Sequence, residues 1–140
     1  MEVSHYLLLD KLEIEGANSI SSLITYGFPA ITGFLGAIHA LNRRHADTEL
    51  EFSGVLIACH ECHVQCFRPH TYADYSFNQS RNPIKKDGKT ASIIEEGKVH
   101  LTVSLVVEIS AKPRASREIR DNAEGFTQRC YEALMQQRVA

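Results

Sequence analysis

The chain has 140 residues, of which 44% are hydrophobic and 23% are charged, and its formal net charge at pH 7 is −2. This composition is ordinary for one globular domain with a single core. Because the net charge is slightly negative, any contact with nucleic acid must come from local patches rather than bulk electrostatics. No stretch predicts a secretory signal or a membrane span, so we expect a cytoplasmic protein with reduced cysteines.

Residues 6–15 predict a first strand, which begins apolar on both faces and ends in alternation, with Leu12 and Ile14 facing inward. Residues 16–29 predict a loop of small and polar residues. Residues 30–44 then predict a helix with an apolar stripe of Phe34, Ile38 and Leu41. Gly33 and Gly36 weaken this helix, which indicates a close approach to a neighbouring element. Arg43 and Arg44 in its last turn suit the helix dipole.

Residues 50–67 predict a long second strand with a bend at Gly54. This strand holds a run of candidate zinc ligands: Cys59, His60, Cys62, His63 and Cys66. In an extended strand, however, Cys59 and Cys62 face opposite sides, and Cys62 and Cys66 lie roughly 13 Å apart, so one ion cannot bind them together. We therefore expect no metal and no cofactor, and keep a small zinc or thiol module as an alternative.

Residues 68–80 predict an irregular stretch that contains Tyr72, Tyr75 and Phe77. Aromatic residues flanked by basic ones suit single-stranded RNA, and a loop that packs its own aromatic rings explains the same composition. Both interpretations stay open.

Residues 81–89 predict a turn-rich basic loop, in which Asn82-Pro83 and Asp87-Gly88 are turn dipeptides. Its cations outnumber its one acidic residue, Asp87, and are Arg81, Lys85, Lys86 and Lys89. Such a loop presents positive charge to a phosphate backbone, although a solvated hairpin loop has the same composition.

Residues 99–109 predict a strand with one face on the core, because apolar residues occupy every second position. That face holds Val99, Leu101, Val103, Leu105, Val107 and Ile109. Residues 111–116 predict a linker, and Ser116 is the expected cap of a second helix that reaches about Arg138. The apolar stripe of this helix is Ile119, Ala123, Phe126, Cys130, Ala133 and Leu134, and Gly125 weakens its middle.

The order strand, helix, strand, strand, helix predicts an α+β fold of the split βαβ kind, ferredoxin-like or RRM-like, without its final edge strand. Such an arrangement leaves the first strand with an open edge, which must be paired by a second copy or by another protein. No catalytic arrangement is present, since His39 has no carboxylate at helical spacing and no nucleophile motif occurs, so we expect no enzymatic activity.

Two blocks of the sequence carry a family resemblance. The first comprises Ser80–Ile84, Asp87-Gly88, Ala91, Ile93–Gly97, His100-Leu101 and Val103–Leu105. The second comprises Ala17-Asn18, Ile20–Ser22, Thr25, Gly27–Pro29, Phe34, Gly36, His39–Leu41 and Arg43-Arg44. Together they resemble the second subunit of the type I-F (Csy) CRISPR surveillance complex, a RAMP-type protein that holds the 5′ handle of the guide RNA. Two positions depart from the family pattern: Leu23 stands where we expect proline, and Tyr26 where we expect tryptophan.

This resemblance implies a single truncated RAMP or RRM-like domain over residues 1–140, with its basic loop at about residues 68–98. It implies RNA contacts from Arg81, Asn82, Lys85, Lys86, Lys89, Arg43 and Arg44. It also implies a protein-binding surface of Asn18, Ser21, Ser22, Tyr26 and Phe28, although Tyr26 and Phe28 equally fit a plug of the core. The implied partners are the guide RNA and the large and backbone subunits of the complex, with no membrane.

Two functions are compatible with the resemblance. A true subunit would bind guide RNA in the bacterial antiviral complex. A stand-alone truncated copy, encoded by the host or by a phage or mobile element, would instead compete for the same partners and block assembly, as an anti-CRISPR mimic does. We expect the competitor if 140 residues is the natural length, and self-association through the first strand if the chain is alone.

Overall fold

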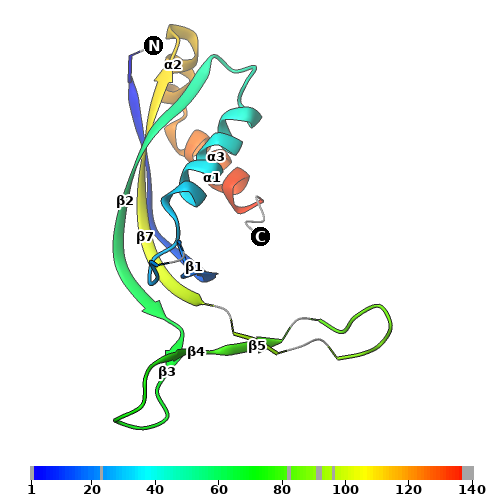
Figure 1. The fold of residues 1–140 in the computed structure, drawn as a ribbon. Helices are drawn as coiled ribbons and strands as arrows, with labels where there is room; N and C mark the ends of the chain where they lie inside the picture. The colour runs from blue at the N-terminus through cyan, green and yellow to red at the C-terminus, as the bar shows by residue number, and fades with distance from the viewer. Residues whose placement is uncertain (1, 23, 82, 91–92, 96, 137–140) are drawn as a thin grey trace. The chain divides into compact units, whose positions relative to one another are not determined.

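The computed structural model describes residues 2–22, 24–81, 83–90, 93–95 and 97–136 (Figure 1). The elements are β1 (His5–Asn18), α1 (Ile31–Arg44), β2 (Leu50–Val64), β3 (Cys66–Phe67), β4 (Ser76–Phe77), β5 (Gln79–Arg81), β6 (Ile93–Glu95), β7 (Lys98–Ala111), α2 (Pro113–Asp121) and α3 (Ala123–Met135). They form two compact units. The first unit comprises Met1–Leu12, Ile31–His60 and Val103–Ala140, and the second comprises Glu13–Ala30 and Glu61–Thr102. Among the described helices, none combines the length and the apolar character that a membrane crossing requires.

The main sheet has the strand order β1-β7-β2, so β7 is central and β1 is an outer strand. Strands β1 and β2 are both antiparallel to β7, as the hydrogen bonds at their ends show. Beside β1, the N–H of Ser4 donates to the carbonyl of Ile109, and the N–H of Gly16 donates to the side chain of His100. At the two ends of β2, main-chain hydrogen bonds join Glu49 to Lys112 and Gln65 to Lys98. This antiparallel order, with a helix between β1 and β2, confirms the predicted α+β fold of the split βαβ kind.

The central strand β7 provides the inner face of the sheet. All six of its predicted inward residues are buried, from Val99 and Val103 at 0% exposure to Leu105 at 6%. The strict alternation therefore predicted this element correctly, because a strand with one covered face must place an apolar side chain at every second position.

Strand β1 changes its phase in the middle. Leu7 and Leu9 are buried in its first half, whereas Leu12 and Ile14 are the more sheltered residues of its second half. Between them Lys11 has a φ of 49°, and its N–H donates to Ser104 Oγ at 3.0 Å. One extra residue in left-handed conformation is the mark of a β-bulge, which moves the following side chains to the opposite face.

In the first unit, α1 and α3 lie on the same face of the sheet (Figure 1). The predicted stripe of α1 is confirmed at Ile38 and Leu41, which are buried. The expected close approach of Gly33 and Gly36 to the sheet is wrong, because a Cβ atom at either position would meet no atom of the described chain within 4 Å, and the alternative of a partner protein at this face stays a prediction. These glycines lie on the exposed side of the helix.

The C-terminal helix is divided where the sequence predicted continuity. Helix α2 starts directly after β7, with Lys112 as its N-cap and Pro113 in its first turn, so the expected linker at 111–116 and the cap at Ser116 are wrong. Asn122 ends α2 and caps α3, its side chain accepting from the N–H of Gly125 at 3.2 Å. The stripe is confirmed at Ile119, Phe126 and Cys130, while Arg138 lies outside the described residues.

The predicted second strand is also divided. Gln65 donates its N–H to the carbonyl of Lys98 on β7 at 2.8 Å, but its own carbonyl accepts from Asn78 at 3.1 Å. The chain thereby leaves the main sheet, and β3 pairs instead with β4 in an antiparallel hairpin, Cys66 opposite Phe77. Near the start of β2, Gly54 lies so close to the Glu108 carboxylate that a Cβ atom would be 2.5 Å from its oxygen, so a side chain at this position would displace Glu108.

Candidate nucleic-acid interface

The basic loop is the tip of a two-stranded ribbon in the second unit. Strands β5 and β6 pair antiparallel, with Gln79 opposite Glu95 and Arg81 opposite Ile93, so residues 82–92 connect their ends. The predicted turn at Asp87-Gly88 is confirmed: Gly88 has a φ of 77° and donates its N–H to the carbonyl of Lys85 at 2.9 Å. Asn82 lies outside the described residues, and Arg81 is placed by its backbone at the end of β5.

Three of the predicted cations share this tip. The side chains of Lys85, Lys86 and Lys89 are exposed, and the N–H of Lys85 donates to the carbonyl of Lys89 at 3.1 Å, which closes the turn. Asp87 balances part of this charge, since its carboxylate lies 4.0 Å from the Lys89 ammonium group. The loop therefore presents a concentrated positive charge to solvent. Lys85 and Lys86 precede Asp87, the acidic residue of the loop.

The predicted protein-binding loop is closed by its own polar groups. Asn18 Oδ1 accepts from the N–H of Ile20, and the hydroxyls of Ser21 and Ser22 both contact Thr25 Oγ1, at 2.7 and 2.6 Å. These side chains are exposed and at the same time hold the loop in shape through their local hydrogen bonds. The residue that the sequence did not single out is Ile24, which is almost fully exposed at its tip. Leu23 lies outside the described residues.

Tyr26 and Phe28 differ in burial. Phe28 is half-buried, which agrees with a place in the packing of its own loop, whereas Tyr26 is 75% exposed and does not plug a core. The Tyr26 ring lies edge-on to the ring of Phe77, with centroids 6.0 Å apart. Both rings line an open groove of about 550 Å³, together with Val64, Cys66, Tyr75 and Ser76.

The remaining aromatic residues of the stretch at 68–80 do not pack against each other. Tyr72 is 97% exposed and Tyr75 is 66% exposed. The guanidinium of Arg68 lies 4.8 Å from the centre of the Tyr75 ring, a cation–π contact. The stretch also contains the short strand β4, which the sequence did not predict.

Arg43 and Arg44 belong to the first unit. They occupy the last turn of α1, as predicted, and both are exposed. Arg44 donates to the side-chain oxygen of Gln136, the C-cap residue of α3, at 3.0 Å. This hydrogen bond links the last turn of α1 to the C-terminal end of α3.

Acidic side chains mark a surface of the second unit that disfavours phosphate. A hollow of about 200 Å³ is lined by Glu13, Glu15 and Glu61 together with His63 and His100. His63 lies 3.6 Å from the Glu61 carboxylate. Because phosphate groups are repelled by such a cluster, RNA bound by this unit would follow the cationic and aromatic side chains instead.

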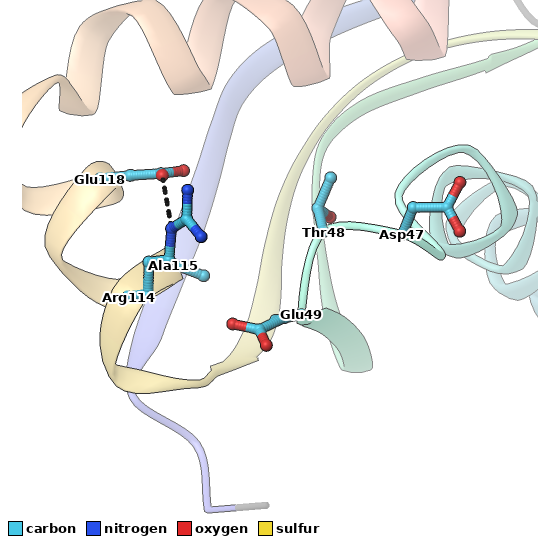
Figure 2. Close-up of a pocket in the computed structure, with 6 residues that line it drawn as sticks. All are labelled: Asp47, Thr48, Glu49, Arg114, Ala115 and Glu118. Carbon is cyan, nitrogen blue, oxygen red and sulfur yellow. Dashed lines mark ion pairs between the residues drawn. The ribbon is translucent and has the colours of Figure 1, made fainter.

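The pocket in Figure 2 is polar but does not gather a reactive centre. It measures about 360 Å³ and lies in the first unit between the loop before β2 and the start of α2. Arg114 pairs with Glu118 at 3.7 Å, while Asp47 points away from both. The carboxylates of this pocket therefore do not converge on a common point.

Ser104 has polar neighbours on two strands, but not in a catalytic order. Its hydroxyl donates to Asp10 Oδ1 at 2.7 Å, and His60 Nε2 lies 2.7 Å from Ser104 Oγ. Because the Ser104 proton is given to the carboxylate, His60 must act as donor and does not serve as a base for the serine. Asp10, Ser104 and His60 lie on β1, β7 and β2, so these hydrogen bonds link all three strands of the main sheet.

The cysteine and histidine run at 59–63 is extended within β2, as predicted, and Cys66 lies in β3. In the part of the chain that the structure describes, no three His, Cys, Asp or Glu side chains are grouped so as to hold a metal ion. The thiol of Cys62 donates instead to the carbonyl of Gly27 at 3.3 Å.

Sequence comparison connects this fold to known proteins. A sequence profile described as "CRISPR-associated protein (Cas_Csy2)" matches residues 7–140, which is nearly the whole chain. The chain belongs to the Csy2 family of CRISPR-associated proteins. The resemblance to the second type I-F Csy subunit is thus confirmed.

A curated Csy2 relative sets the extent of this similarity. The chain is 45% identical, over 104 residues, to the CRISPR-associated protein Csy2 of Pseudomonas aeruginosa strain UCBPP-PA14. The aligned region covers 74% of this chain and 32% of that protein. The aligned part of the chain therefore corresponds to about a third of the length of this Csy2 relative.

Proposed function

We propose that this Csy2-family chain is a non-catalytic RNA-binding module that holds guide RNA through the basic loop at the tip of the β5–β6 ribbon. The observation that carries the proposal is the exposure of Lys85, Lys86 and Lys89 together on one short turn. Exposed ammonium groups on a projecting turn contact phosphates without burying charge. Arg81 and Asn82 belong to the same proposed surface.

The proposal extends to protein partners. In a type I-F surveillance complex the chain would contact the large and backbone subunits, with the loop at residues 18–28 as one contact surface. The exposed Ile24 and Tyr26 give this loop an apolar tip, which suits burial against another protein. The proposed RNA contacts also include Arg43 and Arg44, and we propose that residues 1–140 act as one RRM-like domain in the bacterial cytoplasm.

A competitor of complex assembly is the second candidate function. The outer strand β1 favours it, because a strand at the edge of a sheet offers its free backbone groups to a strand of another chain. A module that docks on the partners of a Csy2 protein through this edge would occupy their docking site and block assembly of the complex. Its gene would then belong to a phage or mobile element that benefits from a blocked complex.

Reconstitution distinguishes these functions. The chain is added to guide RNA and the other subunits of a type I-F complex from which Csy2 is omitted, and the products are separated by size and weighed by native mass spectrometry. A completed complex supports the subunit role. A trapped smaller assembly, together with inhibition when intact Csy2 is added later, supports the competitor. If the chain joins neither RNA nor any subunit, both proposals fail.

A further inference from the structure

The aromatic groove of the second unit is a site that neither the basic loop nor the protein-binding loop explains. Tyr26 and Phe77 form one side through their edge-on contact, and Tyr75 contributes a ring that is 66% exposed. Exposed tyrosine rings around an open hollow are costly to leave in water, because most large aromatic side chains gain stability by burial. The groove is therefore suited to a flat apolar ligand.

A cation at this groove points to the kind of ligand. Arg68 lies over Tyr75 at 4.8 Å, so a positive charge stands beside an aromatic face. Asp74, the neighbour of Tyr75, is an exposed acid in the same loop and opposes this charge in part. A ligand that combines a flat ring with a phosphate meets both partners, whereas an aliphatic protein side chain would make no use of the guanidinium.

The position of the groove along the chain connects it to the basic loop. Phe77 on β4 is followed by β5 from Gln79, and the cations lie at the far end of that strand. From Phe77 to Arg81, the end of β5, the chain advances four residues, which is roughly 13 Å at about 3.3 Å per residue. One short single strand of RNA therefore has the length to contact the groove with a base and the loop with its phosphates.

We propose that this groove, lined by Tyr26, Tyr75 and Phe77, binds an unpaired base of single-stranded RNA, with Arg68 contacting the adjacent phosphate. This inference rests on the proposed RNA-binding function and adds a base-stacking site to it. Stacking on tyrosine is tolerant of base identity, so the groove holds the strand without reading its sequence.

Two RNA probes of equal charge test the inference. One is an eight-nucleotide oligoadenylate and the other is the same backbone with abasic sugars, and binding of the full-length chain to each is measured by fluorescence anisotropy. Tyr75→Ala should weaken binding of the oligoadenylate about fivefold or more, since a stacked base contributes on the order of 1–3 kcal/mol, and should leave abasic binding unchanged. Tyr75→Phe keeps the ring and should bind both probes as the wild type does.

Tyr72→Ala is the matched control, because Tyr72 lies in the same stretch, is 97% exposed and does not line the groove. It should bind both probes normally. Circular dichroism and urea unfolding show that each variant is folded. The inference is overturned if Tyr75→Ala binds the oligoadenylate as the wild type does, or weakens both probes equally. If the wild type binds neither probe, the proposed RNA-binding function has failed as well, so the two failures are distinguishable.

Discussion

Asn42 on α1 and the main chain of Phe52 on β2 form a reciprocal pair of hydrogen bonds. Asn42 Nδ2 donates to the Phe52 carbonyl at 2.5 Å, and Asn42 Oδ1 accepts from the Phe52 N–H at 2.6 Å. The Phe52 side chain is 2% exposed and stacks on Phe126 of α3, with ring planes 6° apart. The Asn42 amide thus holds the start of β2 against α1, and the Phe52 ring packs against α3.

Replacing this amide should destabilise the first unit. Asn42→Ala leaves two partly buried main-chain groups of Phe52 without their partner, and each unsatisfied group costs roughly 1–3 kcal/mol. We expect the free energy of unfolding, measured by urea titration, to fall by about 2 kcal/mol or more. Gln128→Ala on the exposed side of α3 is the control and should change it little. An unchanged midpoint in Asn42→Ala would show that the amide does not hold β2.

His45 should make stability depend on pH. Burial, with further contributions from Arg129 and Arg44, lowers the pKa of His45 below its usual value. The ring lies 5.6 Å from Phe52 and 6.5 Å from Phe126. Because the unfolded chain then binds a proton more readily, the free energy of unfolding should decrease as the pH falls through about 6.5 towards the lower folded-state value.

The variant His45→Phe isolates this effect, because it keeps an aromatic ring between the same partners and removes the proton. Urea midpoints at pH 7.5 and pH 5.5 should differ more for the wild type than for His45→Phe. Equal differences in the two proteins would assign the pH dependence to other groups.

The four cysteines should fall into two reactivity classes. Burial raises the pKa of the Cys130 thiol to about 11, and this side chain is fully buried, whereas Cys59, Cys62 and Cys66 are exposed. Since the thiolate is the reactive form, titration with a disulfide reagent at pH 8 should modify three thiols quickly and the fourth only in denaturant. Four rapidly modified thiols in the folded protein would contradict the packing of α3.

The open edge of β1 should drive association. Leu8 on β1 is 57% exposed, and Leu56 on β2, the other outer strand, is 60% exposed, which provides a matched pair of positions. At micromolar concentration we expect light scattering to detect dimers of the isolated chain. Leu8→Lys should reduce their fraction, because a charge on an edge strand disfavours pairing. Leu56→Lys applies the same change to β2, and a larger loss of dimer in that variant would assign the pairing to β2 instead. A stable monomer would mean that β1 is not the associating strand.

Features that are determined by neighbouring residues in the chain could be predicted from the sequence, and features that depend on residues far apart could not. The alternation of Val99 to Ile109 is a local signal and predicted β7 with every inward residue, and Asp87-Gly88 predicted its turn because only two residues determine it. The division at Asn122 was missed because the apolar stripe of Ile119, Phe126 and Cys130 continues across it. Asn122 and the first-turn Pro113 were available capping signals.

In the candidate site, the charged loop could be predicted from the sequence but the aromatic groove could not. The sequence indicated Lys85, Lys86 and Lys89, since clustered charge is visible in one stretch. The contact between Tyr26 and Phe77 joins residues far apart in the chain, so only the folded second unit brings these rings to one groove. Asn42 was overlooked for the same reason, because its partner Phe52 lies on a different element.

The central claim, that the tip of the β5–β6 ribbon contacts RNA phosphates, is tested most directly by the salt dependence of RNA binding. The affinity for a single-stranded RNA is measured over a range of salt concentrations for the wild type, for Lys85→Ala/Lys86→Ala, and for Arg114→Ala/Arg117→Ala on α2 as a control of equal charge. The account predicts weaker binding by the lysine variant, with a slope of log affinity against log salt that is shallower by about 1.4, at about 0.7 per lost phosphate contact. A slope that equals the wild-type value, or one that the control changes as much, would contradict the account.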